Sequence, residues 1–260
     1  MIDGSRYAIV VDLGATNMRV AVVCEDGSIG VSNKESTVAG NGPIDSMDRL
    51  GTMINNLLSK SAVEQSIGIG VSIASPVDPA SGTLYRPPNL PGWDRFSPKL
   101  YIEEKFGKEV VIANDASLGA LGEYTYGFGR GYRNLIFLTL STGVGGGVIV
   151  NGELMLGSHG FAAELGHMVI DREGPACGCG GWGCLEALVS GTAIASQAYS
   201  LVDAGDHSML WDMVDGEIGH ITAEMVMEAA LAGDNLSSMV IHKFSENLAL
   251  GLANLTHIFD

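Results

Sequence analysis

The sequence predicts an α/β protein with two lobes. Its 260 residues exceed the roughly 100–200 residues of a usual domain. A strand–turn–strand pattern at residues 7–24 returns at residues 135–150 as a weak internal duplication, and helical spacing follows the strands in both halves. We therefore expect an N-terminal lobe at residues 1–116, a C-terminal lobe at residues 117–260, and a ligand cleft between them.

The N-terminal lobe begins with a β-hairpin, because two apolar runs flank a short turn that contains Gly14. Apolar residues that recur every three or four positions predict a helix at residues 43–60. Prolines and glycines indicate an irregular loop at residues 74–97. Further strands are expected at residues 28–37, 66–73 and 109–113, with a short helix at residues 100–106 that Gly107 ends.

The second half opens with a helix of small residues at residues 116–126, which Asn114 or Asp115 is suited to cap. Asn151 and Gly152 form a favourable two-residue hairpin turn. The other expected elements are a strand, a glycine-rich turn, a second strand and a mostly helical end, at residues 135–140, 141–147, 148–150 and 185–260.

The charge balance disfavours two classes of partner. Lysine and arginine total 14 against 30 acidic residues, a net charge of −16. A nucleic-acid binder needs a basic surface, and an anionic membrane repels an acidic protein. The sequence has no apolar run of the ~18 residues that span a membrane, and its polar start shows no signal peptide. We predict a cytoplasmic protein that binds neither nucleic acid nor membranes.

The cysteines predict a metal site. Three of the four lie within eight residues, which disfavours a disulfide framework. Cys177, Cys179 and Cys184, together with His167, offer the three thiolates and one imidazole that suit tetrahedral Zn²⁺. Four protein ligands predict a closed, structural site. The Cys-x-Cys spacing differs from the Cys-x-x-Cys of thiol exchange, and the alternative is a set of free buried cysteines.

The first hairpin turn is a candidate phosphate site. Asp12 ends a strand, Gly14 lets a phosphate approach the backbone amides, and Thr16 can donate a hydrogen bond to a phosphate oxygen. Asp12 is suited to hold Mg²⁺ directly or through water. The alternative is an ordinary Asp/Gly turn.

The second candidate phosphate site is the glycine-rich turn at residues 141–147. Glycine supplies 36 residues of the chain, about twice the usual share, and Gly143, Gly145 and Gly146 stand beside Thr142 in this turn. Their unhindered amides suit a phosphate group. The turn is neither a Walker A loop nor a dinucleotide fingerprint, since no Gly-Lys-Ser/Thr follows and a strand comes next.

Asp115 is the candidate catalytic base. It follows a buried strand, so its carboxylate can accept a proton from a substrate hydroxyl during phosphoryl transfer. The alternative is a plain helix cap. Glu164 and Glu186 flank the cysteine cluster, and with Asn114 and Asp115 they form the kind of set that recognises vicinal hydroxyls. The alternative for each glutamate is a solvated surface charge.

Taken together, these residues resemble the ROK family of sugar kinases and related repressors. The resemblance runs from Ile9 to the end of the chain. It rests on Asp12-Leu-Gly-Ala-Thr-Asn-Met-Arg19, Leu90-Pro-Gly-Trp93, Asn114-Asp-Ala116, Leu140-Ser-Thr-Gly-Val-Gly-Gly-Gly147, Glu164-Leu-Gly-His167 and Cys177-Gly-Cys-Gly-Gly-Trp-Gly-Cys-Leu-Glu186.

The resemblance implies a two-lobed actin-like, hexokinase-type ATPase fold with mixed sheets flanked by helices. It implies that Asp115 acts as the base toward the sugar hydroxyl and that the zinc site shapes the sugar pocket. The two turns would hold the phosphates of Mg·ATP. The sugar contacts it implies are Asn89, Asn114, Glu164, His167 and Glu186.

Two departures from the family stand out. Ala74-Ser75 replaces a Pro-Gly of many relatives, and the added side chain near Ser75 is expected to affect sugar preference. Relatives also continue past Asp260 with a strand, a glycine-rich turn over the adenosine and a closing helix. The sequence therefore leaves open whether this chain is active.

The leading hypothesis is an ATP-dependent hexose kinase, first of all a glucokinase. The alternatives are a sugar-sensing repressor, disfavoured by the acidic charge and by the lack of a helix-turn-helix before the first strand, and a non-catalytic sugar binder. Three questions stay open: which sugar is the acceptor, whether ATP or another compound is the phosphoryl donor, and whether the protein is a monomer or a homo-oligomer (dimer or tetramer).

Overall fold

The computed structural model describes residues 6–260, and contacts within the chain divide them into two compact units. Unit 1 consists of the described residues up to Leu135 together with Val148–Ala163, and unit 2 of Ile136–Gly147 together with Glu164–Asp260. This grouping differs from a single division after residue 116, because the helix that follows contacts strands of unit 1. Two sheets flanked by helices confirm the predicted α/β class.

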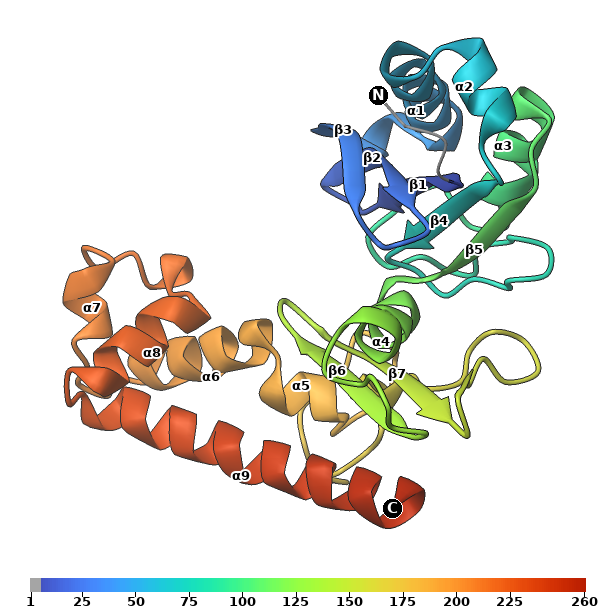
Figure 1. Ribbon diagram of the computed structural model, residues 1–260. Coiled ribbons are helices and arrows are strands. Elements are labelled where there is room, and N and C mark those ends of the chain that lie inside the picture. The colour runs from blue at the N-terminus through green and yellow to red at the C-terminus, as the bar shows by residue number, and fades with distance from the viewer. Residues whose placement is uncertain (1–5) are drawn as a thin grey trace. The chain divides into compact units, whose positions relative to one another are not determined.

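Unit 1 contains a five-stranded mixed sheet in the order β3-β2-β1-β4-β5 (Figure 1). The three N-terminal strands pair antiparallel, whereas β1 pairs parallel with β4, and β4 with β5. Every second residue of β1 is buried, as a strand packed on one face requires. The strands are β1 Tyr7–Leu13, β2 Asn17–Cys24, β3 Ile29–Ser36, β4 Ile69–Ile73 and β5 Val110–Asn114.

Helices cover this sheet where the apolar spacing predicts them. Met47, Leu50 and Ile54 of α1 are fully buried at helical intervals. The expected helix at residues 43–60 is two helices, because Leu58 is extended and Ser59 caps α2. The helical segments are η1 Ala39–Asn41, α1 Pro43–Leu57, α2 Lys60–Gln65, α3 Pro98–Phe106 and α4 Asp115–Tyr126.

A smaller sheet has the order β6-β7-β8 and comprises β6 Leu135–Leu140, β7 Val144–Val150 and β8 Glu153–Leu154. Asn151 and Gly152 have φ of 55° and 87°, which a two-residue hairpin turn needs. The predicted turn at residues 141–147 was too long, since β7 begins at Val144 and includes three glycines. Pairing with β6 in the sheet overrides their low strand propensity, while β8 pairs with Ile149 and Val150, beyond the glycines.

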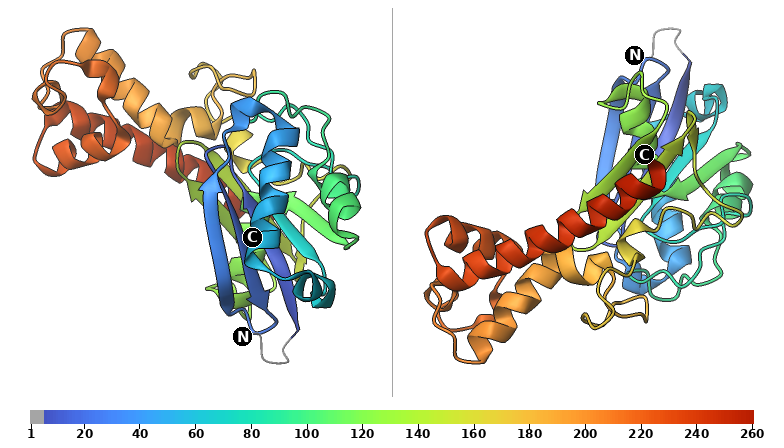
Figure 2. Two further views of the ribbon diagram at one scale, coloured as in Figure 1. Left: turned by 90° about the horizontal axis from the view of Figure 1, so that it is seen from above. Right: turned by 90° about the horizontal axis from the view of Figure 1, so that it is seen from below.

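Unit 2 is mostly helical, as predicted. The 25-residue α9 runs along α5, α6 and α8 (Figures 1 and 2). One face of α9 is therefore internal. The helical segments are η2 Leu165–His167, α5 Leu185–Val189, α6 Gly191–Asp203, α7 Leu210–Met213, η3 Ile218–His220, α8 Ala223–Leu231 and α9 Asn235–Phe259.

Within residues 6–260, the longest helices are too short or too polar to cross a membrane.

Candidate active site and metal centre

The first candidate phosphate turn lies between β1 and β2 in unit 1. The Gly14 amide donates to the Asn17 carbonyl at 3.0 Å, and a Cβ on Gly14 would lie 3.2 Å from that oxygen. The buried Thr37 hydroxyl donates to the Gly14 carbonyl at 2.6 Å, and its amide donates to the Thr16 carbonyl at 2.9 Å. Thr37, which sequence reasoning missed, therefore holds the turn from the end of β3.

Arg19 was also missed as part of this site. It pairs with Asp12 across the hairpin, and its Nη1 lies 2.5 Å from Asp12 Oδ2. Both side chains are about half exposed. A signal for this contact exists in the sequence, because opposite charges that flank a short hairpin turn become cross-strand neighbours. The carboxylate that is the candidate Mg²⁺ ligand thus carries a permanent cation beside it.

The structure decides between the two possible caps of α4. Asn114 is the N-cap, and its Oδ1 accepts hydrogen bonds from the amides of Ala116 at 3.0 Å and Ser117 at 3.3 Å. Asp115 Oδ1 accepts from the Ala116 amide at 2.8 Å. The Asp115 side chain reaches solvent, yet desolvation by the protein around it raises the pKa of its carboxyl, and the negative charge of Asp12 adds to this rise.

Asn89 is exposed in the irregular loop of unit 1. The loop is anchored by the fully buried Leu90 and Trp93. The role of Asn89 as a sugar contact stays a prediction. Ser75 is buried and donates from its hydroxyl to the Pro76 carbonyl at 3.2 Å.

In unit 2, the glycine turn between β6 and β7 is held by the helices that follow the cysteine cluster. The Gly191 amide donates to the Ser141 carbonyl at 2.8 Å, and the Thr192 hydroxyl donates to the Thr142 carbonyl at 2.8 Å. The Val144 amide donates to Glu186 Oε2 at 2.9 Å. The Val144 amide is therefore not available to a phosphate, although the sequence predicted a row of open amides here. Gly145 and Gly146 belong to β7 rather than to the turn.

A cavity of about 580 Å³ opens beside this turn, and all of its walls belong to unit 2. Hydroxyl groups, a carboxylate and apolar side chains share the lining, which suits a ligand with both a planar apolar part and polar groups. The sequence did not reveal this cavity, because its walls come from segments far apart in the chain. They include Thr142, Thr192, Ile194, Ile221, Thr222, Glu224 and Phe244.

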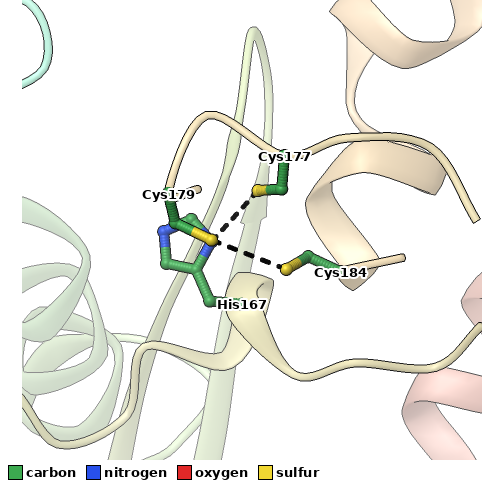
Figure 3. Close-up of side chains that lie close together, drawn as sticks. All are labelled: His167, Cys177, Cys179 and Cys184. Carbon is green, nitrogen blue, oxygen red and sulfur yellow. Dashed lines mark hydrogen bonds between the residues drawn. The ribbon is translucent and has the colours of Figure 1, made fainter. Parts of the chain in front are cut away.

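The four predicted metal ligands converge (Figure 3). The candidate donor atoms of His167, Cys177, Cys179 and Cys184 all lie within 4.8 Å of one another. The sulfurs of Cys179 and Cys184 are 3.7 Å apart, and His167 Nδ1 is 3.6 Å from the Cys177 sulfur. Two sulfurs bound to Zn²⁺ at about 2.3 Å stand about 3.8 Å apart in a tetrahedron. The donor set and its spacing fit a zinc ion.

Glycines allow the cysteine loop to close around that point. Gly183 has a φ of 64°, and a Cβ there would lie 1.4 Å from the Asp171 carbonyl oxygen. Hydrogen bonds between Cys177 and the glycines at 180 and 181, each of 2.9–3.0 Å, tighten the loop. Burial raises the pKa of the Cys184 thiol to about 12, so a thiolate at this position requires a cation beside it.

Glu186 adjoins the cluster as predicted. Its Oε1 lies 3.7 Å from the Cys177 sulfur and 3.9 Å from His167 Nδ1. Glu164 directly precedes η2, and its carbonyl accepts the His167 amide at 3.0 Å. The Glu186 carboxylate therefore lies beside the residues of the metal cluster, and the Glu164 backbone forms part of the turn that carries His167.

Comparison with known proteins gives one consistent family. Residues 8–260 match the ROK family. The chain is 36% identical over 255 residues to a glucokinase of Thermotoga maritima, an alignment that covers 97% of this chain and 78% of that protein. A xylose repressor of Caldicellulosiruptor bescii is 35% identical over 196 residues, which cover 75% of this chain and 48% of the repressor.

The fold is also similar to solved structures. A ROK family glucokinase from Streptomyces griseus, in complex with glucose and AMPPNP, matches with a TM-score of 0.78 and 32% identity, over 98% of this chain and 80% of that one. The predicted actin-like ATPase fold is thereby confirmed.

Proposed function

This chain belongs to the ROK family, and from that premise we propose that it is an ATP-dependent sugar kinase with a hexose as acceptor. The leading candidate is glucose, because relatives at 32–36% identity are glucokinases and a similar structure binds glucose with an ATP analogue.

The observation that carries the proposal is Asp115 at the N-terminus of α4 with a raised pKa. An aspartate with a raised pKa is a stronger base once it is ionised. Asp115 would accept the proton of the sugar's primary hydroxyl as that oxygen bonds to the γ-phosphorus of ATP. The bond from phosphorus to the bridging oxygen breaks, and ADP leaves with that electron pair.

The donor side of the proposal uses one turn from each unit. Asp12 would hold Mg²⁺, which neutralises phosphate charge, and Gly14 and Thr16 would contact phosphate oxygens in unit 1. In unit 2, Thr142 and Gly143 would contact phosphate oxygens, while the adjoining cavity has the volume and mixed lining for a nucleoside. Each assignment rests on the geometry within its own unit.

The sugar contacts are proposed on the same basis. Asn89, Asn114 and Asp115 would accept or donate hydrogen bonds to sugar hydroxyls from unit 1. Glu164, His167 and Glu186 would do so from unit 2, where His167 belongs to the metal cluster and Glu186 lies beside it. Zn²⁺ would serve structure there, since all four of its positions are filled by protein side chains.

A second candidate function is sugar sensing without catalysis. It is favoured by the 35% identity to a xylose repressor over 196 residues. The two functions share sugar binding and differ in whether Asp115 transfers a proton. They are therefore separable by measuring turnover and binding on the same protein.

The test is a coupled assay of ADP release across a panel of aldohexoses, ketohexoses and N-acetylated amino sugars, with ATP and Mg²⁺. A kinase releases ADP with at least one sugar, and Asp115→Asn lowers kcat by at least about 100-fold, far more than it weakens sugar binding measured by calorimetry. Sugar binding without sugar-dependent ADP release would overturn the kinase assignment and favour the sensor.

A further inference from the structure

Three contacts meet on one residue of the glycine turn, Val144. Its amide donates to Glu186 Oε2 at 2.9 Å. Its carbonyl oxygen lies so close to Gly166 that a Cβ there would approach it to 2.0 Å. Its side chain is buried against Leu185 and Val189. The amide, the carbonyl and the side chain of a single residue are thus each fixed by a different neighbour.

Each of these neighbours is tied in sequence to the metal cluster. Gly166 precedes the ligand His167, Leu185 follows the ligand Cys184, and Glu186 is one residue further along. The two halves of the cluster, the imidazole half and the cysteine half, therefore reach Val144 from separate directions. Gly166 and His167 share η2, and Leu185 and Glu186 begin α5 directly after its N-cap Cys184, so the ligands and these contacts are neighbours within the same short elements.

The two carboxylate oxygens of Glu186 contact different parts of the site, the metal cluster and the glycine turn. Oε1 faces the cluster, at 3.7 Å from the Cys177 sulfur, and Oε2 faces the turn. A Cβ on Gly143 would lie 2.5 Å from Oε2, so the turn approaches this carboxylate more closely than any larger residue would allow. A carboxylate that accepts a backbone amide is a strong, charge-assisted contact.

We propose that Glu186 is a positioning residue that couples the Cys₃His cluster to the glycine turn, so that zinc loading orders the turn and tightens the binding of nucleotide phosphates. The inference rests on the proposed kinase function only for the identity of the ligand. His167, Cys177, Cys179 and Cys184 would hold the ion, which would fix Gly166 and Glu186 at the spacing that clamps Val144. In the metal-free protein these two contacts would be free to separate, and the turn would lose their support.

The test measures binding and backbone protection rather than turnover. Wild-type protein, as purified and after removal of metal with a chelator, is titrated with Mg²⁺·AMPPNP in the absence of sugar. The exchange of the Val144 amide hydrogen is followed in the same samples. Metal removal is expected to weaken AMPPNP binding about tenfold, the size of one charge-assisted hydrogen bond, and to speed exchange at Val144. Added ZnCl₂ restores both.

Two substitutions of glutamate locate the effect. Glu186→Ala is expected to weaken AMPPNP binding by a similar factor, to leave zinc content at the wild-type level, and to make nucleotide affinity independent of zinc. Glu186→Gln keeps an acceptor oxygen and recovers part of the affinity. Glu173→Ala removes an exposed carboxylate from the same loop and serves as the matched control with wild-type behaviour.

Two results would overturn the coupling: Glu186→Ala that binds AMPPNP as the wild type does, or a zinc dependence that survives in this variant. A protein that binds no nucleotide at all contradicts the proposed kinase function instead. In that case the Val144 exchange rate, with and without zinc, still decides whether the cluster supports the turn.

Discussion

Asp12 and Arg19 form an ion pair across the first hairpin, with 2.5 Å between Asp12 Oδ2 and Arg19 Nη1. The pair matters because Asp12 also acts on Asp115, whose carboxyl pKa its negative charge helps to raise. Arg19 therefore partly neutralises the charge that acts on the candidate base. The charges of Asp12, Arg19 and Asp115 therefore influence one another, although Asp115 is far from the other two in the sequence.

The pH profile of kcat/KM is expected to report the interaction of these charges. Its acid limb should lie above the ordinary aspartate pKa of 3.8, because desolvation and Asp12 raise the pKa of Asp115. Arg19→Gln leaves the negative charge of Asp12 uncompensated, so the acid limb is expected to move to higher pH. Arg19→Lys keeps the positive charge, and its acid limb is expected to stay near that of the wild type. Arg6→Gln breaks an exposed pair with Glu25 in the same hairpin and is the control. A limb that stays in place or moves down in Arg19→Gln contradicts the assignment.

The stability of an Asp115 variant follows from the same shift. A raised carboxyl pKa in the folded state means that ionisation of Asp115 opposes folding. This cost is absent below the unfolded pKa and grows as pH rises through the folded pKa. Asp115→Asn, which keeps an acceptor for the Ala116 amide, is therefore expected to raise Tm at pH 7 and not at pH 3. Thermal unfolding followed by circular dichroism tests this; a gain at both pH values argues against it.

Metal analysis should find one zinc per chain. Cys184→Ser replaces a buried ligand and is expected to abolish stoichiometric zinc and to lower Tm, because a structural metal contributes folding free energy directly. Cys24→Ser removes the cysteine that lies outside the cluster, and this variant should keep the zinc content and the Tm of the wild type. Zinc measured by plasma mass spectrometry decides; full occupancy in Cys184→Ser would refute the four-ligand site.

Glycine is required at position 183 and dispensable at position 178. Gly183→Ala combines a positive φ with a Cβ 1.4 Å from the Asp171 carbonyl oxygen, so the loop must move, at a cost of more than about 1 kcal/mol. Gly178 has open space around its Cβ position. We expect lower Tm and weaker zinc binding, by competition with a chromogenic chelator, for Gly183→Ala alone. Equal behaviour of the two variants would show that the loop tolerates the clash.

The hydroxyl of Thr192 is expected to affect ATP rather than sugar. Thr192→Val keeps the shape of the side chain but removes its hydrogen bond to the Thr142 carbonyl. One neutral hydrogen bond corresponds to about a fivefold rise in the KM for ATP, with the KM for sugar unchanged. Thr125→Val loses a similar bond to Leu121 on the exposed side of α4 and is the matched control. A rise in the KM for sugar instead would place the turn outside the nucleotide site.

Much of this protein can be read from residues that lie close together in the chain. The β1–β2 hairpin, a helix cap at Asn114 or Asp115 and the cluster of four candidate zinc ligands each depend on local spacing. The structure contains the hairpin, has Asn114 as the cap and brings the four candidate ligands together. Local geometry sets strand alternation, turn closure and the reach of neighbouring ligands. Apolar spacing likewise predicts the helix that begins at Pro43, but it does not predict the break at Leu58.

What the chain alone could not reveal depends on segments that meet only after folding. Gly145 and Gly146 form strand rather than turn because this part of β7 pairs with β6. The Thr192 contact with the turn and the clamp on Val144 join residues through the packing of whole elements. The sequence by itself determined most of the elements, the candidate metal ligands and the family; the tertiary structure decided which backbone groups those side chains hold, because such contacts depend on distances that spacing along the chain does not encode.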